Sequence, residues 1–354
     1  MTTLTLSILL TTFLRLCSQN PTHSWTLLPN ILVLEVNSSS GTHPLSCLQE
    51  APGGDHQSQE IIWRKDGEEE EQRGNVYLVQ LKKSLGGGNY SCHSREGSLL
   101  NYTLVLIQEK GIMGRILVRN DQEDYIKCSA QNYNGHFHCS WSWHPNRVSR
   151  VAFIKAWRVS NDGQCSVDKG VQRWTCPSGS TTFVCTVEQS GDRISCVDQG
   201  HCPYSEETQR ISVSVYVVTQ HFLLENYSKR FHLFDIVKPD KVSVSQVNST
   251  MIQWSYPPSW SSPSSYFPLR FQVAQLRRGC SGCDDPCADF RPAKTRRVQT
   301  TETCHLKVWN KAKTVCVRAT DALCNSQWSE WSHVRLRRHK KNKKVKHHPS
   351  RQAE

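Results

Sequence analysis

Trp328-Ser329-Glu330-Trp331-Ser332 is the stretch that decides the fold of this chain. Its two tryptophans are three residues apart, and residues at that spacing lie on one face of a polyproline-II-like segment. Just before it, Thr314-Val315-Cys316-Val317-Arg318 alternates in polarity, as does Ile211–Val217 much earlier. Short alternating runs rich in β-branched residues are typical of the strands of β-sandwiches. No long amphipathic helix is visible, so we predict an all-β fold.

The two ends of the chain predict a secreted protein. Leu4–Leu14 is an apolar run with the length of a signal-peptide core, about 7–15 residues. We therefore interpret residues 1–24 as a signal peptide, with cleavage after Ser18 or after Ser24. Beyond the two tryptophans the sequence turns basic, and no run of about 20 apolar residues, the length that a bilayer requires, follows. The sequence predicts no membrane span.

Cysteines and glycosylation sequons point to the same oxidising route. The chain has 16 cysteines, of which Cys17 lies in the predicted signal peptide. Fifteen remaining thiols are too many for a reducing compartment unless they bind metal. Five Asn-x-Ser/Thr sequons add to this expectation, and we predict N-glycosylation at Asn37, Asn89, Asn101, Asn226 and Asn248.

Positive charge is concentrated at the end of the chain. The formal net charge is +12, and residues 335–354 contribute nine lysines and arginines against one glutamate. We expect residues 339–354 to be a disordered basic tail. No aromatic residues interleave with the basic ones, which argues against nucleic acid. Acidic glycans of the heparan type, bound through residues 335–351, are one hypothesis, and an inert tail is the other.

Residues 25–108 have the pattern of an immunoglobulin-like domain. Its signature is a cysteine pair with a tryptophan between them, which packs on the disulfide that joins two sheets: Cys47, Trp63 and Cys92. Tyr90 stands two residues before the second cysteine, at the position of a tyrosine corner. We interpret the acidic run Glu68–Glu71 as a solvated loop.

Two further domains follow, at 109–237 and 238–338, separated by Lys238-Pro239-Asp240, where proline restricts the backbone. The first begins with Cys128 and Cys139, with ten residues between them, and a tryptophan two positions later. This spacing suits two adjacent strands clamped by a disulfide. Five more cysteines leave the pairing open, because four cysteines allow three connectivities and one member is odd: Cys165, Cys176, Cys185, Cys196 and Cys202.

The last domain holds six cysteines, and their spacing raises the question of a metal. The stretch Cys280–Cys287 contains a Cys-x2-Cys knuckle of the kind that zinc favours. In an oxidising compartment we instead expect a cross-linked loop, since Cys304, Cys316 and Cys324 complete a set sufficient for three disulfides. We predict no metal and no cofactor. No catalytic motif is recognisable, so we predict that the chain is not an enzyme.

These motifs together resemble a known family. Trp-Ser-x-Trp-Ser is the signature of the last fibronectin type III domain of haematopoietic cytokine receptors, and Cys-x10-Cys-x-Trp is typical of the domain before it. One immunoglobulin-like and two fibronectin type III domains without an anchor resemble the interleukin-12 beta-subunit family. Longer stretches carry the resemblance further: Cys128–Phe137, Glu225–Ser228, Asp235–Asp240, Trp254–Ser261 and Ser264–Phe267.

The resemblance implies a function and a set of site residues. In that family, the beta subunit captures a four-helix-bundle alpha subunit at the elbow between its fibronectin domains, and the pair engages cell-surface cytokine receptors. Cys202 matches the cysteine that forms the interchain disulfide. The matching partner-binding residues are Glu206, Glu207, Tyr266 and Asp321, the last of which meets an arginine of the partner. The family's aromatic residues after Asp321 are replaced by Leu323 and Cys324.

The resemblance also implies structural roles. Arg318 is expected to stack between Trp328 and Trp331, in a ladder that includes Ser329 and Ser332. The implied disulfides are Cys47–Cys92, Cys128–Cys139 and Cys176–Cys196, in which case Cys165 pairs with Cys185. The alternative functions are a soluble receptor that binds its ligand non-covalently, as a decoy or carrier, and a matrix or glycan-binding protein. A homodimer linked through Cys202 is a further possibility.

Overall fold

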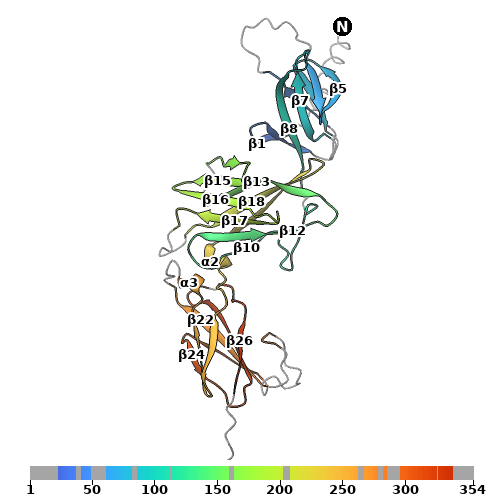
Figure 1. The fold of residues 1–354 in the computed structure, drawn as a ribbon. Coiled ribbons are helices and arrows are strands. Elements are labelled where there is room, and N and C mark those ends of the chain that lie inside the picture. Colours follow the sequence, from blue (N-terminus) through green and yellow to red (C-terminus); the bar gives the residue numbers. More distant parts are fainter. Residues whose placement is uncertain are drawn as a thin grey trace, which may run out of the picture. The chain divides into compact units, whose positions relative to one another are not determined.

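The structure, a computed structural model, describes residues 23–36, 41–48, 61–81, 86–111, 114–158, 163–201, 208–261, 267–277, 282–284, 296–324 and 326–337. Strands make up nearly all of its regular structure, which confirms the predicted all-β class (Figure 1). The helices of the described part, α2 (Leu233–Ile236) and α3 (Pro258–Ser261), are four residues each. None of these described helices has the length and apolar character needed to cross a membrane.

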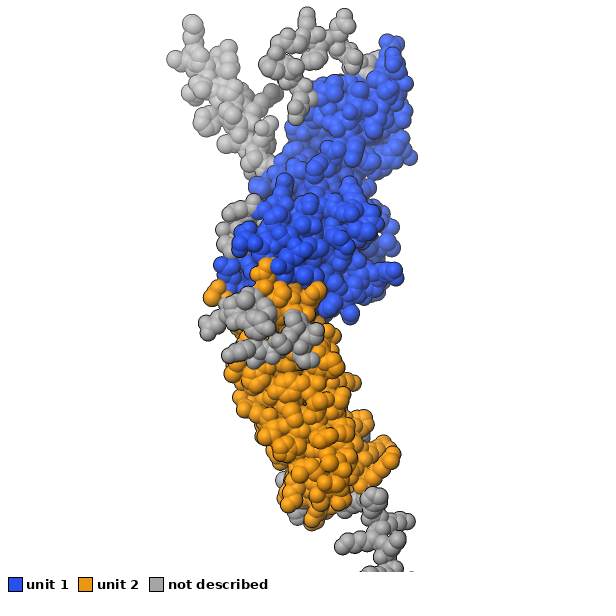
Figure 2. All heavy atoms as spheres, turned by 60° about the vertical axis from the view of Figure 1, so that its left-hand side comes forward, with its two compact units in different colours: residues 1–128, 138–199, 209–230 blue, residues 129–137, 200–208, 231–354 orange. Residues whose placement is uncertain are grey.

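Contacts divide the chain into two compact units, coloured separately in Figure 2. Unit 1 comprises residues 1–128, 138–199 and 209–230, and unit 2 comprises residues 129–137, 200–208 and 231–354. Unit 1 contains two groups of sheets, and unit 2 contains one. The boundaries of the three domains at 25–108, 109–237 and 238–338 stay a prediction.

The first group of sheets in unit 1 is a β-sandwich. Its larger sheet runs in the order β1 (Ser24–Leu28), β2 (Ile31–Val36), β8 (Leu99–Glu109), β7 (Gly88–His93), β4 (Ile62–Lys65), β5 (Glu68–Arg73). A two-stranded sheet of β3 (Gly41–Ser46) and β6 (Val76–Leu81) accompanies it. Strand β2 runs parallel to β8, and the other pairs are antiparallel. Because Ser24 already belongs to β1, signal cleavage after Ser24 would remove the first residue of that strand.

The core of this sandwich forms around the predicted cysteine pair. Cys47 and Cys92 form a disulfide, and Trp63 is only 2% exposed beside them. The ring of Tyr77 lies 5.4 Å from that of Trp63 and 5.3 Å from that of Tyr90. The hydroxyl of Tyr90 donates to the carbonyl of Gly86 at 3.0 Å, so the tyrosine at the predicted corner ties its strand to the preceding loop.

The acidic run Glu68–Glu71 is not the loop that we predicted but most of strand β5. This strand pairs only with β4 and ends the sheet, so its glutamates can stay solvated although its backbone is paired on one side. Glu69 pairs with Arg73 at 2.6 Å, and Glu70 accepts a hydrogen bond from Tyr77 at 2.9 Å. A charged run therefore marks the margin of a sheet here.

The second group of sheets in unit 1 contains eleven strands. A six-stranded sheet runs in the order β10 (Lys127–Ser129), β11 (His136–Ser140), β17 (Arg193–Asp198), β16 (Thr181–Val187), β15 (Arg173–Ser178), β14 (Ser166–Asp168). Opposite it are the three-stranded sheet β13 (Ser149–Trp157), β18 (Ile211–Thr219), β19 (Leu224–Phe231) and the pair β9 (Leu117–Val118), β12 (Ser142–Trp143). Strand β18 is buried at eight of its nine positions and forms the centre of this group.

The disulfides of this group correct one implied pairing. Cys128–Cys139 joins β10 to β11, but Cys176 bonds Cys165 and Cys196 bonds Cys185. The expected Cys176–Cys196 and Cys165–Cys185 pairs are therefore wrong. The strand register explains the difference, because Cys185 and Cys196 stand directly opposite each other in β16 and β17. Cys165 likewise precedes Ser166, which pairs with Thr175, next to Cys176. Each bridge closes a single hairpin.

Close backbone contacts connect the two groups within unit 1. The amide of Ile107 in β8 donates to the carbonyl of Phe222 at 2.9 Å. A Cβ atom on Gly87 would lie 2.5 Å from the Cβ of Phe222, so only glycine fits there. The carboxylate of Glu225, 3% exposed, accepts hydrogen bonds from the amide of Ile116 at 3.0 Å and from the hydroxyl of Tyr227. The bonds of Glu225 hold the residue before β9 against β19.

Unit 2 is built around a third sandwich. One sheet contains β20 (Ser243–Asn248), β21 (Met251–Ser255) and β24 (His305–Lys307), and the other runs β23 (Arg296–Thr301), β22 (Leu269–Leu276), β25 (Thr314–Asp321), β26 (Ser332–Arg335). The ring of Trp254 packs 5.5 Å from that of Phe271, across the two sheets. Val273 and Val317 are fully buried between them.

The predicted set of three disulfides does not form in this unit. Cys283 forms a disulfide with Cys316. Cys304, which lies in the described part of the chain, has a free thiol. With Cys304 unpaired, the six cysteines cannot form three bridges among themselves. Cys280 and Cys287 lie outside the described residues. Within the described residues, no group of three or more side chains is arranged to hold a metal ion.

Candidate partner-binding site

The tryptophans of the opening motif flank one arginine of β25. The guanidinium of Arg318 lies 5.0 Å from the ring centroid of Trp328 and 4.5 Å from that of Trp331. Its Nε also donates to the side chain of Gln272 on β22 at 2.9 Å. Ser329, 3% exposed, donates its amide to the carbonyl of Ala319 at 2.7 Å. The half-buried ladder is thus part of the frame of the sheet.

The turn between β10 and β11 belongs to unit 2 and is held within it by backbone hydrogen bonds. The amide of Ala130 donates to the carbonyl of Ile236 at 2.9 Å, and the amide of Lys238 donates back to Ala130 at 2.7 Å. The side-chain amide of Asn132 donates to the carbonyl of Ser259 in α3. These bonds hold the turn in one position, and so they fix the side chain that follows Asn132.

That side chain is Tyr133, the centre of a group of four residues that we call the elbow cluster: Tyr133, Trp260, Phe267 and Asp321. The ring of Tyr133 lies 4.5 Å from that of Phe267 and 5.9 Å from that of Trp260. Trp260 is 1% exposed, and its indole nitrogen donates to the carbonyl of Phe267 at 2.8 Å. Tyr133 and Phe267 are half-buried, so their outer faces remain accessible.

Asp321 completes the elbow cluster, and its carboxylate oxygens already accept several hydrogen bonds. Its carboxylate accepts from the hydroxyl of Tyr133 at 2.6 Å and from the amides of Leu323 at 2.7 Å and Cys324 at 3.2 Å. The residue is only 1% exposed. The chain by itself therefore presents no open carboxylate here to a partner's arginine, in contrast to the role that the resemblance implied for Asp321.

The electrostatic state of the pair follows from this burial. Burial is the main cause that raises the pKa of the Tyr133 phenol, and the hydrogen bond to Asp321 and its negative charge raise it further. Tyr133 therefore stays protonated and remains a donor throughout the physiological range. The hydrogen bond to Asp321 also orients the tyrosine ring.

The loop after Asp321 carries the exposed part of the site. Leu323 is 65% exposed although its own amide is bonded to Asp321. Arg270 supports the same loop by donating to the carbonyl of Ala322 at 3.0 Å. An apolar side chain is thus displayed on a loop with a fixed backbone, where the related family has aromatic residues.

Several predicted site residues lie outside the described residues. They are Cys202, Glu206, Glu207 and Tyr266, together with the sequon at Asn37, the predicted signal peptide up to residue 22 and the predicted basic tail at 339–354. The sequence interpretation did not single out Tyr133, Trp260 or Phe267, although all three occur in the stretches that carry the resemblance. Their clustering depends on contacts between distant parts of the chain, which no local pattern reveals.

The four described sequons differ in their surroundings. Asn89 is exposed on β7, and Asn248 is exposed at the end of β20. The side-chain amide of Asn101 donates to the carbonyl of Cys47 at 2.9 Å, so it already has a partner. Asn226 is half-buried on β19, and its side-chain oxygen is enclosed without a hydrogen-bond donor.

Comparisons with known proteins agree with these features. A family model described as the C-terminus of cytokine interleukin-12p40 matches residues 123–219. Interleukin-12 subunit beta of Sigmodon hispidus is 30% identical over 335 residues, which cover 88% of this chain and 92% of that protein. The subunit of Sus scrofa is 30% identical over 333 residues, with coverages of 88% and 92%. That of Homo sapiens is 29% identical over 278 residues, with coverages of 74% and 77%.

Proposed function

Because this chain belongs to the interleukin-12 subunit beta family, we propose that it is the secreted beta subunit of a heterodimeric cytokine. It captures a four-helix-bundle alpha subunit at the elbow, and the pair engages cell-surface cytokine receptors in immune signalling. The chain is a cytokine subunit and not an enzyme, since the family consists of cytokine subunits. The choice of alpha subunit and of receptors is left open by this proposal.

The elbow cluster supports capture of the alpha subunit at the elbow. Its aromatic faces and Leu323 form an apolar, partly exposed surface on a backbone that is already held by hydrogen bonds. A preformed surface loses little conformational entropy on binding, and buried aromatic anchors dominate the energetics of interfaces. We propose that the alpha subunit packs on Tyr133, Phe267 and Leu323, while Asp321 orients Tyr133 from behind.

A covalent link through Cys202 completes the proposal. It rests on the match of Cys202 to the cysteine that forms the interchain disulfide in the family, and the structure describes only the residues that flank it along the chain. Arg158 donates to Asp198 at 2.9 Å and to the carbonyl of Gln209 at 2.8 Å, so one guanidinium holds both flanks of the stretch that contains Cys202. Asp198 is 1% exposed, which makes this bond a well-shielded anchor.

Gel migration of the secreted protein tests the covalent link directly. We would co-express the chain with a candidate helical alpha chain and compare wild type, Cys202→Ser and Cys304→Ser, with and without reductant. Cys304→Ser is the matched control because it removes the free thiol that the structure does describe. We expect wild type and Cys304→Ser to give a heterodimer that reductant separates, whereas Cys202→Ser gives no cross-link.

Other outcomes would favour other functions. A wild-type chain that stays monomeric with every helical alpha chain offered would favour the alternative of a soluble receptor that binds its ligand non-covalently. A reductant-sensitive species formed without an alpha chain, and lost in Cys202→Ser, would indicate a homodimer. If Cys304→Ser rather than Cys202→Ser abolished the cross-link, the assignment of Cys202 would be wrong.

Glycan binding through residues 335–351 is proposed as an accessory property. Arg335 and Arg337 are exposed at the end of the described chain, and the remaining sequence of this stretch is strongly basic. Charge attraction of this kind weakens steeply with salt. Retention on heparin that is salt-sensitive and is lost when residues 338–354 are deleted, with capture of the alpha chain unchanged, would support it. Unchanged retention after the deletion would contradict it.

A further inference from the structure

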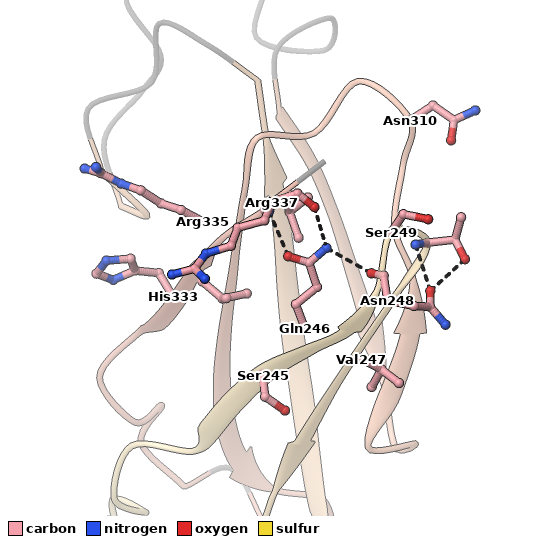
Figure 3. Close-up of a pocket in the computed structure, with 12 residues that line it drawn as sticks. Ser245, Gln246, Val247, Asn248, Ser249, Asn310, His333, Arg335 and Arg337 are labelled. Carbon is pink, nitrogen blue, oxygen red and sulfur yellow. Dashed lines mark hydrogen bonds between the residues drawn. The ribbon is translucent and has the colours of Figure 1, made fainter. Parts of the chain in front are cut away.

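An open groove lies in unit 2 between the β20–β21 hairpin and β26 with the two residues that follow it. Its volume is about 1390 Å³. Figure 3 shows that its walls come from separate stretches, with Asn248 and Asn310 on one side and His333 and Arg335 on the other. Amide, imidazole and guanidinium groups predominate among the polar groups of its lining: Gln246, Asn248, Asn310, His333, Arg335 and Arg337. Such groups form hydrogen bonds with hydroxyl-rich ligands.

The groove has a fixed base. The side-chain amide of Gln246 donates to the carbonyls of Asn248 at 2.9 Å and Arg337 at 3.0 Å, and its oxygen accepts from the amide of Arg337 at 2.8 Å (Figure 3). The amide of Leu336 also donates to the carbonyl of Lys313 at 2.9 Å. One glutamine thus ties the hairpin to the segment after β26, and the groove between them is built into the fold.

Asn248 stands at the rim of this groove in a conformation suited to a modification. It begins the sequon Asn248-Ser249-Thr250, in the turn between β20 and β21. Its side-chain oxygen accepts from both the amide and the hydroxyl of Thr250, each at 2.9 Å. The nitrogen of the side chain consequently points away from the strands (Figure 3). In Asn101, by contrast, this nitrogen donates to a backbone carbonyl.

We infer that the first sugars of the N-linked glycan predicted at Asn248 lie in the groove. In the transfer reaction, the side-chain nitrogen of Asn248 forms a bond to the anomeric carbon of an oligosaccharide held on a lipid diphosphate. The bond between that carbon and the diphosphate oxygen breaks, the lipid diphosphate leaves, and the amide proton passes to a base of the transferase. An exposed turn accommodates the product without any rearrangement of the fold.

Attachment at the rim explains why the glycan itself is the expected occupant. A sugar chain tethered a few ångströms from the groove has a high effective concentration there, so even weak hydrogen bonds suffice to hold it. The groove is open to solvent and lined by polar groups, which suits a hydrated, branched ligand better than an apolar one. This inference rests on the secretory route that is part of the proposed function, but not on capture of an alpha subunit.

Isotope-coded deglycosylation of the secreted full chain tests the modification. Enzymatic removal of N-glycans in heavy-oxygen water labels each asparagine that carried one, and peptide mass spectrometry locates the label. We expect label at Asn248 in wild type and in Thr250→Ser, and none at this position in Thr250→Ala. Asn310→Gln, which alters an asparagine of the same groove outside any sequon, should keep the label. Label at other sequons but none at Asn248 would overturn the inference, whereas a chain that is not secreted would contradict the proposed function instead.

Hydrogen exchange tests where the sugars lie. We would compare the intact glycoprotein with the same protein trimmed enzymatically to its first sugar, so that the sequence is identical in both. Sugars in the groove should slow the exchange of amides in residues 333–337 several-fold in the intact form and leave β23, which does not line the groove, unchanged. Equal exchange in both forms would show that the glycan extends into solvent and would overturn this part.

Discussion

Tyr133 and Asp321 are 188 residues apart in the sequence and 2.6 Å apart in the fold. Tyr133→Phe keeps the ring contacts. It removes the hydroxyl that donates to the buried carboxylate of Asp321. We expect the free energy of unfolding to fall by about 2 kcal/mol, the usual value for a hydrogen bond to a charged group. Denaturant unfolding would measure the change. Tyr102→Phe, on a tyrosine that is 45% exposed, should have almost no effect, and equal losses in both variants would contradict the assignment.

The buried tyrosines also predict how stability responds to alkali. Burial and the hydrogen bond to Glu70 raise the pKa of Tyr77 to about 12, and burial likewise raises the pKa values of Tyr90 and Tyr133. An unfolded tyrosine ionises near pH 10. Below this pH both states are protonated and stability is unaffected. Above it the unfolded chain loses protons first, so stability should fall as the pH rises from about 10 toward 12. Unfolding curves recorded on both sides of pH 10 would check this, and a flat profile would contradict it.

At the residue scale, the sequence located some of these positions and missed others for a physical reason. Asp321 and Arg318 were identified because they stand near a distinctive motif in the chain. The burial of Asp321 was not foreseen, because it depends on a tyrosine from a distant turn. Trp260 and Phe267 were missed since an aromatic residue looks the same in sequence whether it joins a cluster or only fills a core.

Gly87 and Phe222 show how elements are joined within unit 1. A Cβ at residue 87 would lie 2.5 Å from the Cβ of Phe222 and 3.4 Å from the carbonyl of Val105, and neither neighbour can move freely. Gly87→Ala should therefore separate the β7 and β18–β19 regions locally and lower the free energy of unfolding by about 1–3 kcal/mol, the typical cost of overpacking. Unfolding of unit 1 followed by tryptophan fluorescence would measure this.

A second glycine provides the control for that prediction. Gly170 is exposed, and a Cβ there would meet only the side chain of Asp168 at an ordinary distance of 3.4 Å. Gly170→Ala should leave stability within about 0.5 kcal/mol of wild type, as surface changes usually do. If the two alanine variants unfolded alike, the close approach of Gly87 to Phe222 would not be a determinant of the junction.

At the element scale, alternation of polarity was enough to predict strands such as Ile211–Val217 and Thr314–Arg318, which β18 and β25 contain. It failed for Glu68–Glu71, because a strand at the margin of a sheet needs no apolar face along most of its length. The disulfide pairing failed for another reason. Spacing gives the distance along the chain, whereas pairing depends on the register of the hairpins, and that register places Cys185 opposite Cys196.

At the scale of the whole molecule, Leu323 provides a direct test of partner capture. The side chain is 65% exposed, so Leu323→Glu should leave the free energy of unfolding nearly unchanged. A charge placed in an apolar interface should nevertheless weaken capture of the alpha chain by roughly tenfold or more, equivalent to about 1.4 kcal/mol. Binding of the separately produced alpha chain, with the Cys202→Ser background to exclude cross-linking, would measure it.

Val148→Glu is the matched control for that experiment. Val148 is 72% exposed, also apolar, and belongs to unit 1 rather than to the elbow cluster. It should bind the alpha chain as the parent does. If Leu323→Glu bound equally well, the proposed contact surface would be wrong, whereas equal weakening in both variants would indicate a general effect of added charge.

The all-β class of the whole molecule followed from short alternating runs and from the lack of a long amphipathic pattern, because a strand with one buried face shows that alternation locally. The division into two compact units did not follow from them. Residues 129–137 belong to the second domain by sequence, yet their backbone bonds to Ile236 and Lys238 group them with unit 2. These bonds join main-chain atoms, so they cannot be predicted from the side chains that the sequence specifies.

The motif at Trp328–Ser332 also bears on whether folded chains aggregate at high concentration. Along the outer side of β25, Val317 pairs with Ser332, Ala319 bonds to Ser329, and the amide of Asp321 donates to the hydroxyl of Ser326 at 2.9 Å. Serines thus cover a strand that would otherwise offer unpaired backbone groups as a template for another chain. The segment that carries the two tryptophans therefore also satisfies backbone groups of β25, and we expect this to limit its pairing with another chain.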